Sequence, residues 1–398
     1  MLKQPHAAKF VEAMIKEITD HEDRKHWIGI PRSSMPKETK TILAIWSFKR
    51  KRLPSGEILK WKARLCCHGG MQQWGVNYWK TYAPIVGWSA VRLLLLAASI
   101  NKIPTRSIDF VLVFPQTELE VPVYMELPAG FNPINGGTKR DCVLKVVTNL
   151  YGLKNASLNW FEKLKQGLEN RNFRQSKIDS CVFIRDNCVI LVYVDDCIII
   201  SPNSEVIDRF VKSMENGPEN FILTDDGDLA RFLGVKIEYK NDGSIEMTQS
   251  YLIQLILDLC GIESNKVNGR DTPVGKPLLH KDLKGLPRKL TWNYRSAVGM
   301  LGYLTGTSRA ELAMAVHQCA RFNNSSMLSH ERAITRICRY LLSTKDKGMI
   351  YRPNHNLGLQ CYVDTDVAGG WTQVDADNPE NLMSRTGFVI MYARCPIL

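Results

Sequence analysis

The sequence has no Cys-x-x-Cys pair among its eleven cysteines, which occur singly or as the adjacent Cys66 and Cys67. It therefore lacks the ligand spacing of a structural zinc site and the framework of a disulfide-rich secreted module. Cys66, Cys67 and His68 are consecutive, and three consecutive residues cannot surround one tetrahedral metal ion. The pattern indicates small buried apolar side chains in a reducing compartment.

Long apolar runs are missing as well. Leu93 to Ala98 and the runs on either side of Asp195 fall far short of the roughly 20 residues that cross a bilayer. Near the start of the chain, Lys3, Lys9 and Glu12 interrupt the apolar residues, so the continuous core of a signal peptide is absent. We therefore expect an intracellular protein that is not secreted and has no membrane partner.

Acidic residues are fewer than basic ones, 40 against 52, which gives a formal net charge of +12. This charge favours an acidic partner, and nucleic acid is the first candidate. Hydrophobic residues make up 44% of the 398 residues, enough for a sizeable core and for two or three compact units. No repeat of 20 to 50 residues is present.

Hydrophobic periodicity predicts alternating helices and strands up to about residue 250 and mostly helices after it, an α/β or α+β body with a helical appendage. The expected strands are Thr41 to Phe48, Ile58 to Cys66, Ile108 to Phe114, Val189 to Val194, Cys197 to Ile200 and Leu359 to Val363. The expected helices are Phe10 to Ile18, Ser89 (as the cap) to Ile100, Ala156 to Glu169, Tyr251 to Cys260, Asn293 to Phe322 and Ser329 to Ser343.

The first two strands form a basic hairpin around a turn at Leu53 to Gly56. From Pro36 to Gly70 there are nine Lys and Arg against Glu38 and Glu57, more than half of the net charge. The tetrad Lys49 to Arg52 is compatible with a solvated strand edge, a nuclear-localisation run or a surface that holds phosphates.

Asp195 and Asp196 lie between two apolar strands that are separated by only these two residues, which predicts a tight hairpin with two carboxylates at its tip. A solvated turn is the alternative, because Asp is a common turn residue. Asp109, near the start of another strand, supplies a third acid. Three converging carboxylates can hold two Mg²⁺ ions for nucleotidyl transfer, and Mn²⁺ could replace them.

The chain resembles the reverse transcriptases of copia-type (pseudovirus) LTR retrotransposons, as a Pol polyprotein fragment. The resemblance covers essentially the whole chain and depends on ordered motifs: Lys62 to Leu65, Tyr82 to Val86, Ile108-Asp109, Val123 to Phe131, Leu150 to Lys154, Tyr193 to Asp196, Phe232 to Gly234, Tyr294 to Gly299, Arg339 to Leu341 and Tyr362 to Asp366.

This resemblance implies an α+β right-hand polymerase fold of fingers, palm and thumb, followed by a truncated ribonuclease H-like strand region. The implied domains are residues 1–35 (helix and linker), 36–249 (fingers and palm), 250–350 (mostly helical thumb and connection) and 351–398. The implied activity is RNA-directed DNA synthesis, with an RNA or DNA template, a DNA primer and dNTPs as partners. The implied location is the cytoplasm, in a virus-like particle, or the nucleus.

The resemblance also implies residue roles. The metal ligands would be Asp109, Asp195 and Asp196. Lys62 and Arg64 would reach the triphosphate, although a surface cation is the alternative for each, and Phe114 would pack under the nucleotide sugar unless it is a plain core residue. The remaining implied residues are Tyr151, Gly152, Lys154 and Asn155 along the templating base pair and the primer grip Phe232, Leu233 and Gly234. In the implied thumb and connection, a phosphate track could be lined by Arg332, Arg336, Arg339, Lys345 and Lys347, and solvated helix faces are the alternative for these cations.

Some positions depart from the family's pattern. Pro115 and Thr117 stand in the loop after the first metal ligand, where the family has other residues, so we expect a changed loop there. Asp364 matches the first acid of a ribonuclease H site, and no plausible second acid follows, so we expect no ribonuclease H activity. A catalytically decayed nucleic-acid-binding remnant is the alternative to an active polymerase.

Overall fold

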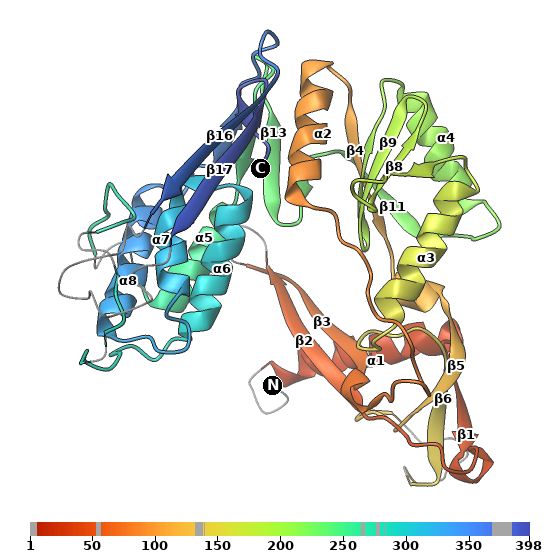
Figure 1. Ribbon diagram of the computed structural model, residues 1–398. Coiled ribbons are helices and arrows are strands. Elements are labelled where there is room, and N and C mark those ends of the chain that lie inside the picture. Colours follow the sequence, from red (N-terminus) through yellow and green to blue (C-terminus); the bar gives the residue numbers. More distant parts are fainter. Residues whose placement is uncertain are drawn as a thin grey trace. The chain divides into compact units, whose positions relative to one another are not determined.

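The computed structural model describes residues 6–52, 57–131, 138, 140–263, 267–275, 279–282, 284–367 and 384–398 (Figure 1). The chain forms two compact units, each assembled from two stretches of sequence. Unit 1 comprises Met1–Val86 and Ser107–Gly227, and unit 2 comprises Gly87–Arg106 and Asp228–Leu398. Helices and antiparallel sheets occur in both, which confirms the α+β class.

A six-stranded sheet, which lies almost entirely in unit 1, carries the candidate site. Its strand order is β11-β4-β10-β9-β8-β7. The bounds are β4 (Thr105–Phe110), β7 (Arg174–Gln175), β8 (Val182–Arg185), β9 (Cys188–Tyr193), β10 (Asp196–Ile200) and β11 (Leu223–Asp228). β9 and β10 are apolar almost throughout because most of their side chains are buried. Helices α3 (Ala156–Glu169) and α4 (Ser204–Glu215) lie beside this sheet in Figure 1.

The rest of unit 1 is a second sheet, a long hairpin and a helix. The sheet has the order β1-β6-β5, formed by β1 (Trp27–Pro31), β5 (Glu118–Met125) and β6 (Cys142–Thr148). The hairpin pairs β2 (Ala44–Arg52) with β3 (Ile58–Cys67). Helix α1 (Ala7–Asp23) packs on β3 through Phe10, whose ring meets Trp61 edge-on at 4.8 Å. The Glu17 carboxylate of this helix also accepts the Leu65 N–H at 3.2 Å.

Unit 2 contains a four-stranded antiparallel sheet. Its order is β12 (Arg231–Phe232), β13 (Val235–Tyr239), β14 (Ile245–Thr248) and β15 (Met349–Tyr351). Helix α2 (Trp88–Ile100) packs on this sheet, with Trp88 against Phe232 at 6.2 Å between ring centroids. The Ser99 hydroxyl donates to the Gly243 carbonyl at 2.8 Å, which ties the last turn of α2 to the β13–β14 turn.

Four helices form an apolar cluster in unit 2: α5 (Ser250–Cys260), α6 (Tyr294–Thr307), α7 (Ala313–Ala320) and α8 (Leu328–Ser343). Their buried side chains recur at helical spacing, so each helix contributes one apolar face. A three-stranded sheet of β16 (Leu359–Asp366), β17 (Arg385–Tyr392) and β18 (Cys395–Pro396) follows along the chain.

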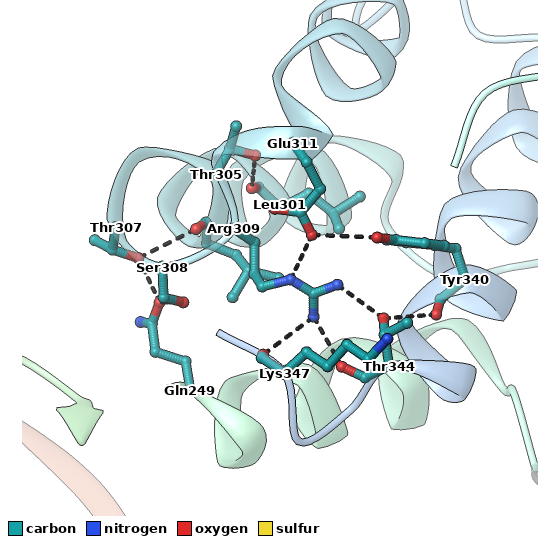
Figure 2. A network of polar contacts seen from close by, with 11 residues as sticks. Gln249, Leu301, Thr305, Thr307, Ser308, Arg309, Glu311, Tyr340, Thr344 and Lys347 are labelled. Carbon is teal, nitrogen blue, oxygen red and sulfur yellow. Dashed lines mark hydrogen bonds and ion pairs between the residues drawn. The ribbon is translucent and has the colours of Figure 1, made fainter. Parts of the chain in front are cut away.

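A buried arginine holds the ends of these helices together (Figure 2). Arg309, 1% exposed, follows α6 and donates to the Glu311 carboxylate at 2.6 Å and to the Thr344 carbonyl at 3.0 Å. A second contact joins its guanidinium to the Thr344 hydroxyl at 2.8 Å. The last carbonyls of a helix have no hydrogen-bond partner within the helix. Arg309 supplies such a partner for the Thr344 carbonyl at the end of α8. The Ser308 hydroxyl donates to Gln249 at 2.7 Å, at the start of α5.

Most of the expected elements are confirmed, although several bounds differ: the strand expected from Thr41 to Phe48 is Ala44–Arg52, and the helix expected from Phe10 to Ile18 is Ala7–Asp23. The helix expected to be capped by Ser89 begins at Trp88, and its N-cap is Gly87. The strand expected from Ile108 to Phe114 ends at Phe110 because Leu112 takes a positive φ of 51° and turns the chain. The turn expected at Leu53 to Gly56 lies outside the described residues. All eleven cysteines are free and nine are buried, as expected.

Candidate active site

The β9–β10 hairpin presents Asp195 at its turn and Asp196 at the first position of β10. Asp196 pairs with Tyr193, so only Val194 and Asp195 form the loop, and Val194 has a positive φ of 56°. This conformation is unfavourable for a β-branched residue and needs support. The buried Trp160 of α3 supplies it, because its indole N–H donates to the Val194 carbonyl at 2.6 Å.

Asp109 lies on the neighbouring strand β4 and is tied to the same turn. The N–H of the next residue, Phe110, donates to the Asp195 carbonyl at 2.9 Å. Phe110 also packs edge-on against Trp160 at 5.2 Å, so one indole supports both the strand and the turn. The three predicted acids are thus brought together, from two adjacent strands of one sheet.

The carboxylates influence one another electrostatically. The pKa of Asp196 is raised to about 6 by burial first, and then by the negative charges of Asp195, Asp109 and Asp226. Asp226, on β11 at the other side of β4, was not expected from the sequence. The adjacent acids Asp225 and Asp226 can be read from the sequence, but only the strand order shows that β11 lies near the hairpin turn.

Among the described residues, no group of three or more His, Cys, Asp and Glu side chains is arranged so that it could hold a metal ion by itself. Mg²⁺ is commonly bound by one or two carboxylates together with substrate phosphates and water. The donor set is therefore chemically suited to Mg²⁺, whose remaining ligands would have to come from substrate and solvent.

Three predicted nucleotide-binding residues form a stack. The Arg64 guanidinium lies over the Tyr151 ring at 4.4 Å, and Phe114 meets the same ring edge-on at 5.0 Å. Burial raises the pKa of the Tyr151 hydroxyl, Arg64 opposes this shift, and the charge of Asp195 adds to it. Tyr151 therefore lies within electrostatic range of the hairpin turn, which connects the stack to the acids.

Gly152 follows this tyrosine at a close approach of two backbones. The Tyr151 carbonyl accepts the N–H of Cys67 at 2.8 Å, and a Cβ on Gly152 would lie 2.2 Å from the Cys67 carbonyl oxygen. Gly152 also has φ of 90°, where other residues are strained. Only glycine fits here, because the Cys67 backbone leaves no room for a Cβ.

Lys154 and Asn155 lie at the start of α3. The Lys154 ammonium donates to the Tyr78 hydroxyl at 3.0 Å and lies 4.8 Å from the centre of the same ring. Asn155 is the N-cap residue without a side-chain cap, and its Oδ1 is buried with no hydrogen-bond partner in the described part of the chain. A buried acceptor without a donor is uncommon and often marks a position of functional importance.

Lys62 lies on β3, opposite Lys49 on β2. Arg50 faces Trp61 across the same hairpin and lies over its ring at 5.6 Å. The described part of this hairpin therefore carries a dense row of cations, in which Lys49 and Lys62 face each other directly.

The other predicted residues belong to unit 2. Phe232, Leu233 and Gly234 make the β12–β13 turn, in which Phe232 is buried and pairs with Val235. Leu233 and Gly234 both have positive φ, 49° and 79°, as in a tight hairpin turn. Asp364 is exposed on β16.

The unusual loop residues after Asp109 suit their backbone. Pro115 lies in the first turn of the 3-10 helix η3 (Phe114–Gln116), where a backbone N–H has no helical partner. Thr117 is extended, and its hydroxyl donates to the Phe114 carbonyl at 2.8 Å. Neither residue is strained.

The sequence matches the protein family described as reverse transcriptase (RNA-dependent DNA polymerase) over residues 32–276, more than half of the chain. The chain belongs to this family. The matched region contains all the predicted metal-ligand and nucleotide-binding positions. The resemblance to copia-type retrotransposon enzymes is confirmed by relatives that match over most of the chain.

Two such relatives are plant Pol polyproteins. The retrovirus-related Pol polyprotein from transposon RE1 of Arabidopsis thaliana is 28% identical over 97% of this chain, and that from transposon TNT 1-94 of Nicotiana tabacum is 26% identical over 99%. The chain spans only 25% and 29% of these relatives' lengths.

Among solved structures, the chain is similar to a foamy viral protease-reverse transcriptase in complex with double-stranded DNA. The TM-score is 0.45 at 12% identity, over 97% of this chain and 54% of that one. Separately, no helix in the described ranges combines the length and apolar character that crossing a membrane requires.

Proposed function

We propose that this chain catalyses RNA-directed DNA synthesis, by two-metal nucleotidyl transfer at Asp109, Asp195 and Asp196. The observation that carries the proposal is the convergence of these acids on adjacent strands, with the Arg64–Tyr151–Phe114 stack within electrostatic range. Membership of the reverse transcriptase family supports the same reaction.

The three carboxylates would hold two Mg²⁺ ions, with Mn²⁺ as an alternative. When bound, the two ions supply charge stabilisation for both the attacking primer oxygen and the leaving pyrophosphate. The hairpin supports this role because its turn is fixed from two sides, by the Trp160 indole and by the Phe110 N–H. Rigid support keeps carboxylates within the narrow geometric tolerance of such chemistry.

Lys62 and Arg64 would contact the triphosphate from the basic hairpin. Arg64 suits this role because its stacking on Tyr151 fixes the plane of the guanidinium, and a fixed guanidinium can hold two phosphate oxygens at once. Its Nε is buried without a hydrogen-bond partner in the described ranges, so a donor is left for a ligand. Phe114, fixed against Tyr151, would form the floor under the sugar and exclude a 2′-hydroxyl.

The other assignments follow the family resemblance. Gly152, Lys154 and Asn155 would lie along the templating base pair with Tyr151. The β12–β13 turn, Phe232 to Gly234, would be the primer grip. The partners would be an RNA or DNA template, a DNA primer and dNTPs, in the cytoplasm or nucleus, and the domains would be the fingers, palm and thumb expected from the sequence. We expect no ribonuclease H activity at Asp364.

Primer extension by the purified chain tests the proposal. With an RNA template, a DNA primer, dNTPs and Mg²⁺, we expect extension that a chelator stops and added Mg²⁺ restores. Binding of the same primer-template is measured in parallel by fluorescence anisotropy. Tight binding without any extension would contradict the proposal and would instead identify a decayed nucleic-acid-binding remnant.

A further inference from the structure

A cavity of about 400 Å³ lies within unit 2, in the region expected to form the thumb and connection and away in sequence from the predicted metal ligands. It is lined by one face of α8, by α7 and by residues 270–275 and Leu279 of the segment that joins α5 to α6. This volume is in the range of cavities that bind small organic molecules.

Four arginines line the cavity. Arg332, Arg336 and Arg339 lie at i, i+4 and i+7 on α8, so they share one helix face, and Arg270 comes from the joining segment. None of the described lining residues is acidic. One carboxylate, that of Asp282, reaches the edge, where it accepts the Ser329 hydroxyl at 2.8 Å. Like charges this close destabilise the helix face unless an anion offsets them.

Two of the arginines hold the joining segment in place. Arg336 donates from Nη2 to the Thr272 hydroxyl at 2.8 Å, and Arg339 donates from Nε to the Asn268 carbonyl at 2.6 Å. The Nε of Arg336 is buried and has no hydrogen-bond partner in the described part of the chain. The side chains of Arg332 and Arg270 have none among those residues either. Several charged donors therefore remain for a ligand.

Much of the remaining wall of the cavity is apolar, beside the polar Gln318, Ser329 and Thr335. Leu279, Ala315, Ala333 and Ile337 line it, together with Cys319. A ligand that matches both walls has an anionic group for the guanidinium groups and an apolar, flat body for the rest. A phosphate fits better than a single carboxylate, because its three acceptor oxygens can take donors from several guanidinium forks.

We propose that this cavity, the α8 arginine pocket, binds a nucleotide through its phosphate, either a free mononucleotide or the 5′-phosphorylated end of a nucleic-acid strand. The proposal does not rest on polymerase activity, because it depends only on the arginines and the apolar wall of unit 2. Arg332 and Arg270 would bind the phosphate, while Ala333 and Leu279 would contact the base or sugar.

Isothermal titration calorimetry of the full chain with adenosine 5′-monophosphate, in the presence of EDTA, tests this. Arg332→Gln should weaken binding about tenfold or more, because it removes a charged donor to the phosphate. The matched control is Arg174→Gln, an exposed arginine of β7 whose side chain has no partner in the described ranges, and Asp195→Asn controls for the polymerase site. Both should bind as the unmodified chain does. Equal affinities for Arg332→Gln and Arg174→Gln would overturn the proposal.

Further probes separate the ligand classes. Adenosine without phosphate should not bind, and inorganic phosphate should bind more weakly than the nucleotide. Ala333→Met, which fills the apolar wall and keeps every arginine, should weaken nucleotide binding and leave inorganic phosphate unchanged. A 5′-phosphorylated oligonucleotide that binds better than its 5′-hydroxyl form would identify a strand end, and binding of the mononucleotide alone would identify a free nucleotide. Tighter binding of a glutamate-rich peptide than of any phosphate probe would contradict the proposal.

Discussion

Gly152 shows how a single residue fixes the relation between two segments of the candidate site. Its backbone meets the Cys67 carbonyl so closely that a Cβ would lie 2.2 Å from the oxygen. The hydrogen bond from the Cys67 N–H to the Tyr151 carbonyl depends on the same approach. Gly152 has no side-chain functional group, yet it positions the ring of Tyr151 and, with that ring, the stacked Arg64.

Gly152→Ala should be strongly destabilising. The control is Gly75→Ala, since Gly75 also has a positive φ, 77°, but an added Cβ there meets nothing within 4 Å. The control should cost about 1–2 kcal/mol of unfolding free energy from the backbone alone, and Gly152→Ala should cost at least about 2 kcal/mol more because the strands must separate. Urea unfolding measures both. Equal losses would mean that the two backbones are not in contact.

A buried histidine gives the fold a pH dependence. The pKa of His26 is lowered from 6.5 to about 4, mainly by burial, then by the neighbouring His21 and Arg24, while Glu17 opposes the shift. The folded chain keeps His26 neutral, and the unfolded chain protonates it below about pH 6.5. Since the unfolded state binds more protons in this range, stability should fall as the pH drops from 6.5 to 4.

His26→Gln should therefore flatten this part of the stability profile. His355→Gln is the control, because His355 is exposed, and it should leave the profile unchanged. The measurement is the urea midpoint at pH 7 and at pH 5. A profile that is equally steep in the His26 variant would assign the acid sensitivity to other groups.

At the scale of elements, the candidate site could be predicted where local pattern decides the structure. Two apolar runs separated by Asp195 and Asp196 have few alternatives to a hairpin, and the structure confirms it. The end of β4 was missed because the run continues past Phe110 as Val111-Leu112-Val113, which looks like a strand, whereas the positive φ of Leu112 turns it. Asp226 was missed because its proximity to the turn depends on strand order.

The β2–β3 hairpin offers a prediction at this scale. Replacing Lys62 and Arg64 together with Gln should raise the KM for dNTP about tenfold or more, with a smaller change in primer-template affinity, because the expected contact is with the triphosphate. Lys49→Gln with Lys60→Gln removes the same charge from the same hairpin and should not raise the KM. Steady-state extension kinetics distinguish the two pairs. Similar KM values would return Lys62 and Arg64 to the role of surface cations.

The hydrogen bonds of Arg309 offer a second prediction at this scale. Arg309→Met should lower the stability of unit 2 by about 3 kcal/mol, because the Thr344 carbonyl at the end of α8 would remain buried without its donor. Glu311→Gln keeps the guanidinium in place and should cost clearly less, since the Glu311 side chain is 45% exposed. Hydrogen exchange of α8 amides gives the local readout. Unchanged protection in Arg309→Met would show that the network is not needed for the helix end.

At the scale of the whole molecule, the α+β class and the family could be recognised from the sequence, whereas the division into units could not. Unit 1 and unit 2 each combine distant segments, and α2, residues 88–100, packs with residues after 228. No local sequence pattern predicts that distant segments join one unit, because this depends on contacts between residues more than a hundred positions apart. The arginines of α8 could be noted from the sequence, whereas the α8 arginine pocket could not, because Arg270 and Arg332 line one cavity only after folding.

The central claim is that the β9–β10 turn is the catalytic metal site of a polymerase. Its most direct test compares Asp195→Asn with Asp186→Asn, an exposed aspartate with positive φ at the β8–β9 turn of the same sheet. On an RNA template with a DNA primer and Mg²⁺, Asp186→Asn should extend the primer like the unmodified chain. Asp195→Asn should show no extension, while its primer-template affinity stays within a few-fold. Extension by Asp195→Asn at the unmodified rate would contradict the account.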